Sequence, residues 1–224
     1  MGKRIAELAA ADKELTLSCL LEYPAHPEIG QNKFGVKVSA DLAQVKNSDV
    51  IIDFTSPEAT LKLLAAAVEQ KKPLIIGTTG LTKEQTEEIV KAGKKIPIIF
   101  SSNMSVGVNT LFRLIRETAA KLKDYKFSIV EAHHIHKKDA PSGTAKTIAE
   151  IIEQETGRPV TDIRSIREGE IIGDHEVVME SDVDTIKLSH SAKTRDIFVK
   201  GTLLAAKWIV KQKPGRYSMQ DVLR

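Results

Sequence analysis

The chain has 224 residues, a formal net charge of +3, a single cysteine and only 4% aromatic residues. No apolar run reaches the roughly 18 residues of a membrane helix, and the charge is too diffuse for a nucleic-acid-binding surface. With one cysteine there is no internal disulfide, and no apolar leader is evident. We therefore expect a cytoplasmic globular protein with neither nucleic-acid nor membrane partners.

The first half of the chain alternates short apolar runs with amphipathic helical stretches. The apolar runs lie at 15–21, 50–54, 73–77 and 96–100. Ser56 followed by Pro57 begins one of the helices, and Thr82 with Gln85 forms a capping box for the next. Continuous apolar runs separated by helices are typical of a parallel sheet covered on both faces. The pattern predicts a doubly wound α/β domain.

From about Val106 the pattern changes. A helix to Leu122, a strand at 127–131, a polar segment at 132–143 and a helix to about Glu155 come in turn. Then follow three β-type runs, at 163–166, 176–180 and 185–189, and a last amphipathic helix at 201–210. Consecutive strands after a helix predict a second, partly antiparallel layer.

The first residues do not follow the α/β pattern. Residues 2–11 favour a helix with no strand before it. A doubly wound dinucleotide-binding domain begins with a strand that runs into a glycine-rich turn. We therefore expect such a domain without its first strand and without most of that turn.

The densest polar cluster follows the strand at 127–131. It contains His133, His134 and His136, at a position where α/β proteins place ligand sites. The histidines allow a metal site, with nearby carboxylates as further ligands, but Lys137 and Lys138 would repel a cation, so no metal is expected. A solvated polar loop is the other alternative.

A helix start follows this cluster. Pro141-Ser142-Gly143-Thr144 opens the helix, and Gly143 would let a ligand approach the backbone closely. The first N–H groups of a helix are unpaired and bind carboxylates or phosphates. With lysine and histidine beside it, this start suits a carboxylate substrate that receives a proton. Alternatively, Ser142 only caps the helix.

Two turns of small polar residues follow apolar strands, as cofactor contacts require. They are Gly77-Thr78-Thr79-Gly80 and Ser101-Ser102-Asn103-Met104. Small residues also end strands without any ligand, so this alternative stays open. Glu22, just after the first apolar run, could accept hydrogen bonds from an adenosine ribose, or could be a surface residue.

Residues 131–145 match E-x-H-H-x-x-K-x-D-A-P-S-G-T-A, and the chain resembles the dihydrodipicolinate reductase family over nearly its whole length. Further landmarks are Asp53-Phe54-Thr55, Arg167-Glu168-Gly169 and Gly173-Asp174-His175. The resemblance implies reduction of a cyclic unsaturated dicarboxylate to tetrahydrodipicolinate with NADH or NADPH, in lysine and diaminopimelate synthesis. It also implies a Rossmann-like dinucleotide-binding domain, placed at 1–106 and 201–224, and an α+β sheet domain at 107–200 that binds substrate and builds a homotetramer.

The resemblance also implies roles for single residues. His133 corresponds to the acid that delivers a proton, and Lys137 to a second catalytic cation. His134, with the backbone of Gly143 and Thr144, would hold a substrate carboxylate. The cofactor contacts would be Glu22, Gly77, Thr78, Thr79, Ser101, Ser102, Asn103 and Met104.

The chain departs from the family pattern at two places. Met1-Gly2 align with the end of the loop G-x-x-G-R-M-G, and the preceding strand and glycines are absent. A non-catalytic fragment that keeps the oligomerising sheet is therefore an alternative, and a metal-dependent hydrolase is a more distant one. Tyr23 stands where some members have an arginine that pairs with the NADPH phosphate, so we expect NADH to serve at least as well as NADPH.

Overall fold

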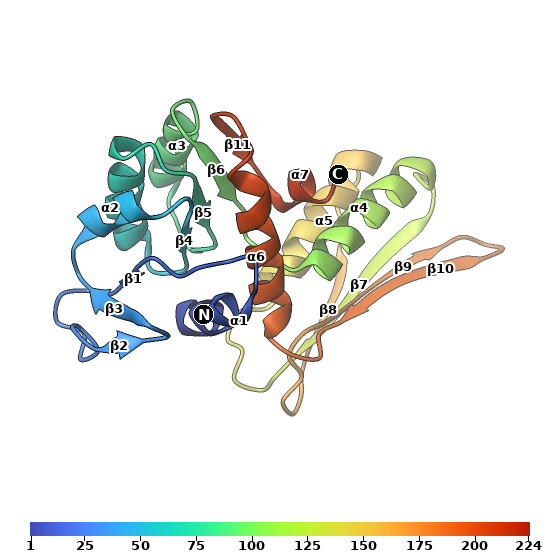
Figure 1. The fold of residues 1–224 in the computed structure, drawn as a ribbon. Helices are drawn as coiled ribbons and strands as arrows, with labels where there is room; N and C mark the ends of the chain where they lie inside the picture. Colours follow the sequence, from blue (N-terminus) through green and yellow to red (C-terminus); the bar gives the residue numbers. More distant parts are fainter. The chain divides into compact units, whose positions relative to one another are not determined.

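The computed structural model describes residues 1–224, which fold into two compact units (Figure 1). Unit 1 comprises Met1–Met104 and Phe198–Arg224, and unit 2 comprises Ser105–Ile197. No helix in the chain is both long and apolar enough to cross a membrane.

The main sheet of unit 1 is parallel, with strand order β11-β6-β5-β4. Its strands are β4 (Ile51–Asp53), β5 (Leu74–Ile76), β6 (Pro97–Phe100) and β11 (Gly215–Tyr217). Helices α2 (Pro57–Glu69) and α3 (Lys83–Ala92) pack on one face, and α6 (Asp196–Ile209) and α7 (Met219–Val222) on the other. Coverage on both faces explains the continuous apolar runs, since Ile75 and Ile76 point to opposite faces and are both fully buried.

The beginning of unit 1 forms a separate small sheet of β1 (Leu20–Leu21), β3 (Val36–Ser39) and β2 (Asn32–Lys33), followed by the 3-10 helix η1 (Leu42–Asn47). Helix α1 (Gly2–Ala11) packs on α6 through Ile5 and Ala9. β1 pairs only with β3, and β4 only with β5. In the dinucleotide fold, one further strand would join these two edges. The sheet therefore lacks its first strand, as the sequence predicts.

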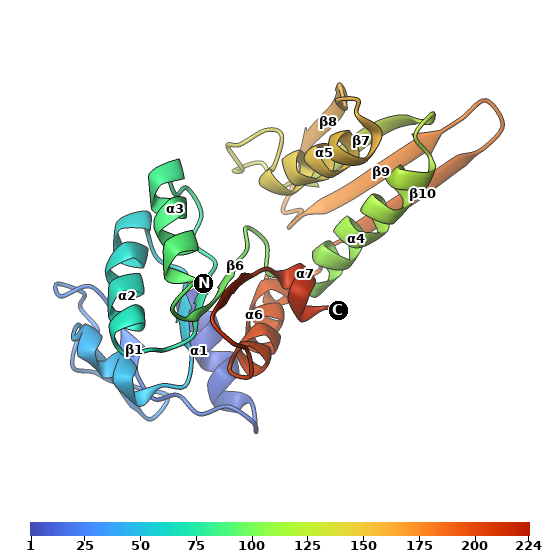
Figure 2. The same cartoon turned by 90° about the horizontal axis from the view of Figure 1, so that it is seen from above.

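Unit 2 contains a mixed four-stranded sheet of order β10-β9-β7-β8. Its strands are β7 (Lys126–His133), β8 (Asp162–Arg167), β9 (Asp174–Glu180) and β10 (Thr185–Ser191). β7 is parallel to β8 and antiparallel to β9. Helices α4 (Val106–Lys121) and α5 (Gly143–Thr156) lie on the same side of this sheet (Figure 2). The second, partly antiparallel layer expected from the sequence is confirmed.

Several element bounds differ from the expected ones. The run 15–21 is a strand only at Leu20–Leu21, because only these residues find ladder partners, in Val38 and Ser39. α6 begins at Asp196 rather than 201, and its first turns include Val199, which is buried against α1. The strand β11 has no apolar pattern and exists because Gly215–Tyr217 pair with residues 97–99 of β6.

Candidate active site

The candidate site continues the core-facing row of β7. Side chains alternate across a strand, so Phe127, Ile129, Glu131 and His133 share one face. Phe127 and Ile129 pack in the core with α4 and α5. Toward the end of the strand the same row becomes polar, and Glu131 and His133 are only 1% and 8% exposed. A buried carboxylate next to a buried imidazole requires compensating partners.

Glu131 receives those partners from three elements. Arg167, at the end of β8, donates from Nη2 to Oε1 at 2.8 Å and from Nη1 to Oε2 at 3.0 Å. The backbone N–H of Ser142 donates to Oε1 at 3.3 Å, and Oε2 also contacts Nδ1 of His133. The register of the sheet explains the meeting, because Arg167 is the ladder partner of His133. One carboxylate therefore joins β7, β8 and the start of α5.

His175 lies on the other side of His133. It is the ladder partner of Glu131 in β9, and its ring meets the ring of His133 edge to face, with centroids 5.2 Å apart. Its Nε2 forms a hydrogen bond of 3.1 Å with the hydroxyl of Ser142, which also accepts from the N–H of Ala145 as the cap of α5. The helix start is thus held by both β7 and β9.

The electrostatics of the cluster follow from burial and pairing. Burial raises the pKa of Glu131, but the hydrogen bonds from Arg167, Ser165 and His133 outweigh it and lower the pKa to about 2. For His133, burial lowers the pKa, Glu131 raises it, and the positive charges of Lys137 and Arg167 lower it, with a net lowering. Burial and the neighbouring His133 lower the pKa of His175 to about 4. Near neutral pH, Glu131 is therefore ionised and His175 is neutral.

The polar loop after β7 is tied to the loop after β8. The N–H of Glu168 donates to the carbonyl of His133, and the N–H of Ile135 donates to that of Gly169. Within the loop, Nζ of Lys137 lies 2.8 Å from Oδ1 of Asp139. His134 is half-buried, and its ring centroid is 6.2 Å from that of His136.

The helix start next to this loop has room for a ligand. Gly143 is exposed, and a Cβ built on it would meet no atom within 4 Å. Thr144 beside it is half-buried. The first backbone N–H groups of a helix carry a partial positive charge, so this end of α5 suits a carboxylate.

The three loop histidines do not form a metal centre. No group of three or more His, Cys, Asp and Glu residues in the chain is arranged to hold an ion. The groups that the structure does bring together are a buried imidazole, its paired carboxylate and a helix start that can bind an anion.

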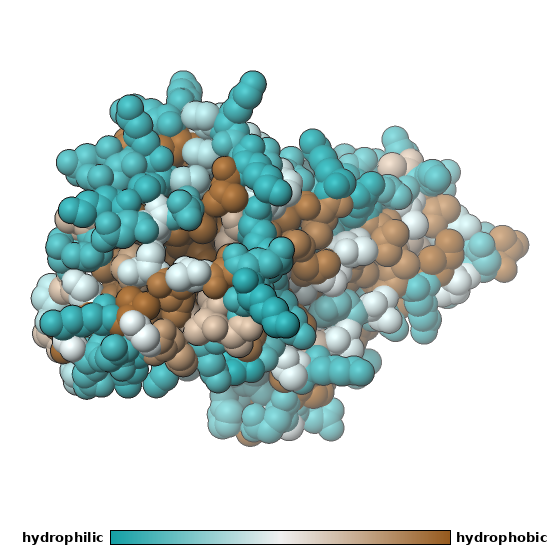
Figure 3. All heavy atoms as spheres, in the orientation of Figure 1, coloured by the Kyte–Doolittle hydropathy of each residue, from teal (hydrophilic) through white to brown (hydrophobic).

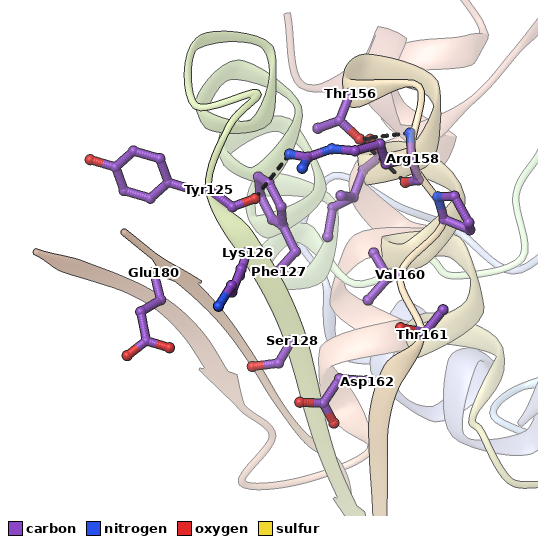
Figure 4. A pocket seen from close by; sticks show the side chains of 12 residues that line it. Tyr125, Lys126, Phe127, Ser128, Thr156, Arg158, Val160, Thr161, Asp162 and Glu180 are labelled. Atoms are coloured by element: carbon purple, nitrogen blue, oxygen red, sulfur yellow. Dashed lines mark hydrogen bonds between the residues drawn. The ribbon is translucent and has the colours of Figure 1, made fainter. Parts of the chain in front are cut away.

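His133 lines neither of two cavities on the surface of unit 2. One, of about 350 Å³, lies at the other end of β7, where the guanidinium of Arg158 points to the backbone of Tyr125 (Figure 4). The second, of about 320 Å³, includes His175 and His190 but otherwise lies on the sheet face away from the helices. Because the first cavity contains none of the buried titratable groups, we do not assign it to catalysis.

The two predicted cofactor turns lie at the carboxyl ends of β5 and β6 in unit 1. Thr79 and Gly80 are exposed, and Gly80 adopts φ +82°, which favours glycine. Thr78 is buried, and its hydroxyl donates to Asp53. The ring of Phe54 packs directly against the backbone of Gly77, because a Cβ at Gly77 would lie only 2.3 Å from that ring.

The side chains of the second turn, residues 101–104, and of Glu22 differ in how far they are exposed. Ser102 is exposed, whereas the hydroxyl of Ser101 donates to the carbonyl of Asn103. The side chain of Met104 is 1% exposed and belongs to the core of unit 1. Glu22 is exposed at the end of β1. Direct side-chain contact with a cofactor is therefore open to Glu22, Thr79 and Ser102, whereas Met104 would contribute only its backbone.

The chain matches known protein families along nearly its whole length. The family models for the N-terminus and the C-terminus of dihydrodipicolinate reductase match residues 1–104 and 107–223. The chain belongs to the dihydrodipicolinate reductase family. Related reductases of this family align with the whole length of the chain.

Relatives named 4-hydroxy-tetrahydrodipicolinate reductase occur in several organisms. Those of Geotalea daltonii and Magnetococcus marinus are 39% and 40% identical over 252 residues, covering all of this chain and 94% of each relative. That of Methanoregula boonei is 39% identical over 238 residues, covering all of this chain and 93% of the relative. This coverage does not favour the alternative of a non-catalytic fragment.

Solved structures agree on the fold. A dipicolinate-bound dihydrodipicolinate reductase from Paenisporosarcina sp. superposes with a TM-score of 0.84 at 20% identity, covering 97% of this chain and 94% of that chain. An aspartate dehydrogenase from Thermotoga maritima gives 0.53 at 11% identity, covering 93% of both chains. The expected α/β fold, a Rossmann-like domain without its first strand plus a sheet domain, is confirmed.

Two members of this cluster, half-buried Arg167 and buried His175, have no role predicted from the sequence. Arg167 and His175 lie within motifs that resemble the family, but they are 36 and 44 positions from Glu131. Only the pairing of β7 with both β8 and β9 brings them to Glu131. The available signal was a polar residue directly flanking each β-type run, Arg167 after 163–166 and His175 before 176–180.

Proposed function

We propose that this chain reduces a dihydrodipicolinate-type substrate, formed from 4-hydroxy-tetrahydrodipicolinate, to tetrahydrodipicolinate with hydride from NADH or NADPH. The relatives carry the name of this reaction. The observation that carries the proposal for the site is the buried His133–Glu131 pair next to the open helix start at Gly143. It places a proton donor beside a position for a carboxylate.

Unit 2 would hold the substrate. One carboxylate fits the backbone N–H groups of Gly143 and Thr144 at the start of α5, with His134 as a further donor. Lys137 would contribute positive charge near the ring, where negative charge develops as the hydride arrives. Its pairing with Asp139 holds it in the loop.

His133 would supply the proton. Hydride addition to one end of the conjugated ring system leaves an enamine-type electron pair, which takes a proton at the neighbouring carbon. Burial lowers the pKa of His133, and the two carboxylates of a bound substrate would raise it again. Binding would thus protonate the acid when it is needed.

Unit 1 would hold the nicotinamide cofactor, which supplies the hydride. Exposed Glu22 can accept hydrogen bonds from the adenosine ribose, and the exposed turn residues Thr79, Gly80 and Ser102 allow close approach. Thr78 and Met104 would support these turns from inside.

Steady-state kinetics test the assigned roles. His133→Gln or Lys137→Ala should lower kcat by about 10²–10⁴-fold, the usual contribution of a general acid. Lys138→Ala is the matched control, because Lys138 is an exposed lysine in the same loop. If both His133→Gln and Lys137→Ala kept kcat within about threefold of the wild type, the assigned roles would be wrong.

Coenzyme choice depends on two neighbours at the end of β1. The carboxylate of Glu22 would repel a 2′-phosphate, and Tyr23 offers no compensating cation. We therefore expect kcat/KM with NADH to equal or exceed that with NADPH. A ratio that favours NADPH by about tenfold would contradict this, and Tyr23→Arg should shift the ratio toward NADPH.

We further propose a cytoplasmic homotetramer assembled through unit 2. Helices α4 and α5 cover one face of the sheet, while the alternate residues Val130 and Val178 point to the other face. Val183, in the β9–β10 hairpin, is 91% exposed, and apolar atoms stand out at the end of this hairpin (Figure 3). The face without helices and the end of this hairpin are the surfaces through which we propose that copies of unit 2 pack together.

A further inference from the structure

We propose that Glu131 and Arg167 act together as positioning residues that set the tautomer and the proton affinity of His133. This inference rests on the proposed role of His133 as the acid. Neither residue is placed against the substrate. They act through the ring that they hold.

The hydrogen bonds on Glu131 fix the tautomer. An ionised carboxylate only accepts hydrogen bonds, so Nδ1 of His133 must carry a proton to bind it. The proton that His133 gains and loses is then the one on Nε2. The two oxygens of Glu131 are held in turn by Arg167 and the N–H of Ser142, so the carboxylate cannot rotate away.

The surroundings of Nε2 fit this assignment. Gly173, just before β9, passes so close that a Cβ there would lie 3.1 Å from Nε2 of His133. Because glycine has no side chain, nothing from residue 173 covers this nitrogen. A side chain at this position would crowd the atom that exchanges the proton.

The charges around His133 act with opposite signs. Glu131, on its own strand, raises the pKa of His133, whereas Arg167 from β8 and Lys137 from the loop lower it. Asp139 pairs with Lys137, and His175 from β9 faces the ring edge to face. If the ion pair between Glu131 and Arg167 were purely structural, removing either residue would lower the stability of the fold. It would not lower the pKa of His133 in one variant and raise it in the other.

The decisive experiment is a titration of histidine side chains by NMR in the ligand-free protein with ¹⁵N-labelled histidine. Glu131→Gln should lower the pKa of His133 by about one unit or more, because it removes the only carboxylate in contact with the ring. Arg167→Gln should raise it. Glu180→Gln is the matched control, since it removes a carboxylate at the far end of the same sheet, and should leave it unchanged.

Kinetics give an independent readout. An acid must be protonated, so kcat falls as the pH rises through the pKa of His133 in the complex. Glu131→Gln should move this loss of activity to lower pH, and Arg167→Gln should move it to higher pH. Glu131→Asp keeps the charge and should recover part of the wild-type profile.

Two outcomes would overturn the inference. One is an unchanged His133 pKa in both folded variants, with only the melting temperature lowered. The other is a shift of the same sign in both. If the wild type showed no reductase activity but the opposite NMR shifts were found, the proposed function would fail and the positioning inference would stand.

Discussion

Glu131 and His133 occupy strand positions whose other inward neighbours, Phe127 and Ile129, are apolar. Two titratable groups in such positions cost free energy unless each is paired. The contacts with Arg167, Ser142 and His175 offset that cost and join all five groups in one connected cluster. At the scale of the residue, the site is therefore built from the same row of side chains as the core.

Gly143 offers a test at this scale. Gly143→Val should raise KM for the dicarboxylate by about tenfold or more, because the added side chain would block the approach of a carboxylate to the helix start. The fold should tolerate the change, since a Cβ there meets no atom within 4 Å. Cofactor affinity should stay nearly intact.

Gly143→Ala provides a graded comparison, with a smaller rise in KM. An equal loss of substrate and cofactor affinity in Gly143→Val would point to misfolding, and an unchanged KM would remove the carboxylate site from this helix start.

At the scale of the element, a second buried carboxylate organises unit 1. Asp53, at the end of β4, is 1% exposed. Its Oδ2 accepts from the hydroxyls of Thr60 in α2 at 2.5 Å and of Thr78 after β5 at 3.2 Å. Its Oδ1 accepts from the hydroxyl of Thr55. One side chain therefore joins a strand, a helix and a predicted cofactor turn.

Asp53→Ala should both destabilise unit 1 and weaken cofactor binding. Buried hydroxyls that lose their acceptor cost about 1–3 kcal/mol, so the melting temperature should fall. The turn after β5 would lose its anchor at Thr78, so KM for NADH should rise while KM for the substrate changes little. Thermal unfolding and initial-rate kinetics measure the two effects.

Asp49→Asn is the control for this experiment, because Asp49 is an exposed carboxylate just before β4. Cofactor affinity that stayed at the wild-type value in a folded Asp53→Ala protein would separate this network from the cofactor turn.

At the scale of the whole molecule, the sheet of unit 2 has helices on only one of its faces. We expect the assembled protein to have four times the chain mass of 24.6 kDa in light scattering. Val178→Glu should lower that mass at least twofold, because it places a charge at a half-buried position on the face without helices. The circular dichroism spectrum should remain that of a folded chain.

Val90→Glu is the matched control, since Val90 is an exposed valine on α3 of unit 1. A tetramer that survives Val178→Glu would place the interface elsewhere, and a monomeric wild type would contradict the proposed assembly.

The sequence by itself determined the order and type of most elements. Apolar runs at 73–77 and 96–100 predicted β5 and β6 because strands buried on both faces need apolar side chains throughout. Capping residues located the starts of α2 and α3, since cap hydrogen bonds are local. The motif at 131–145 led to the family, and His133, Lys137, His134, Gly143 and Thr144 were selected from it and remain predictions for the site.

Only the tertiary structure decided which distant residues meet. β11 carries no apolar pattern and depends on its ladder partner β6, and pairing with β3 decided which part of the apolar run 15–21 became β1. The register of β7 with β8 and β9 brought Arg167 and His175 to Glu131. The packing of unit 1 also decided that the side chains of Met104 and Thr78 are buried. Local propensity acts over a few neighbours along the chain, whereas these contacts join residues separated by 18 to 118 positions, so they follow from strand pairing and packing alone.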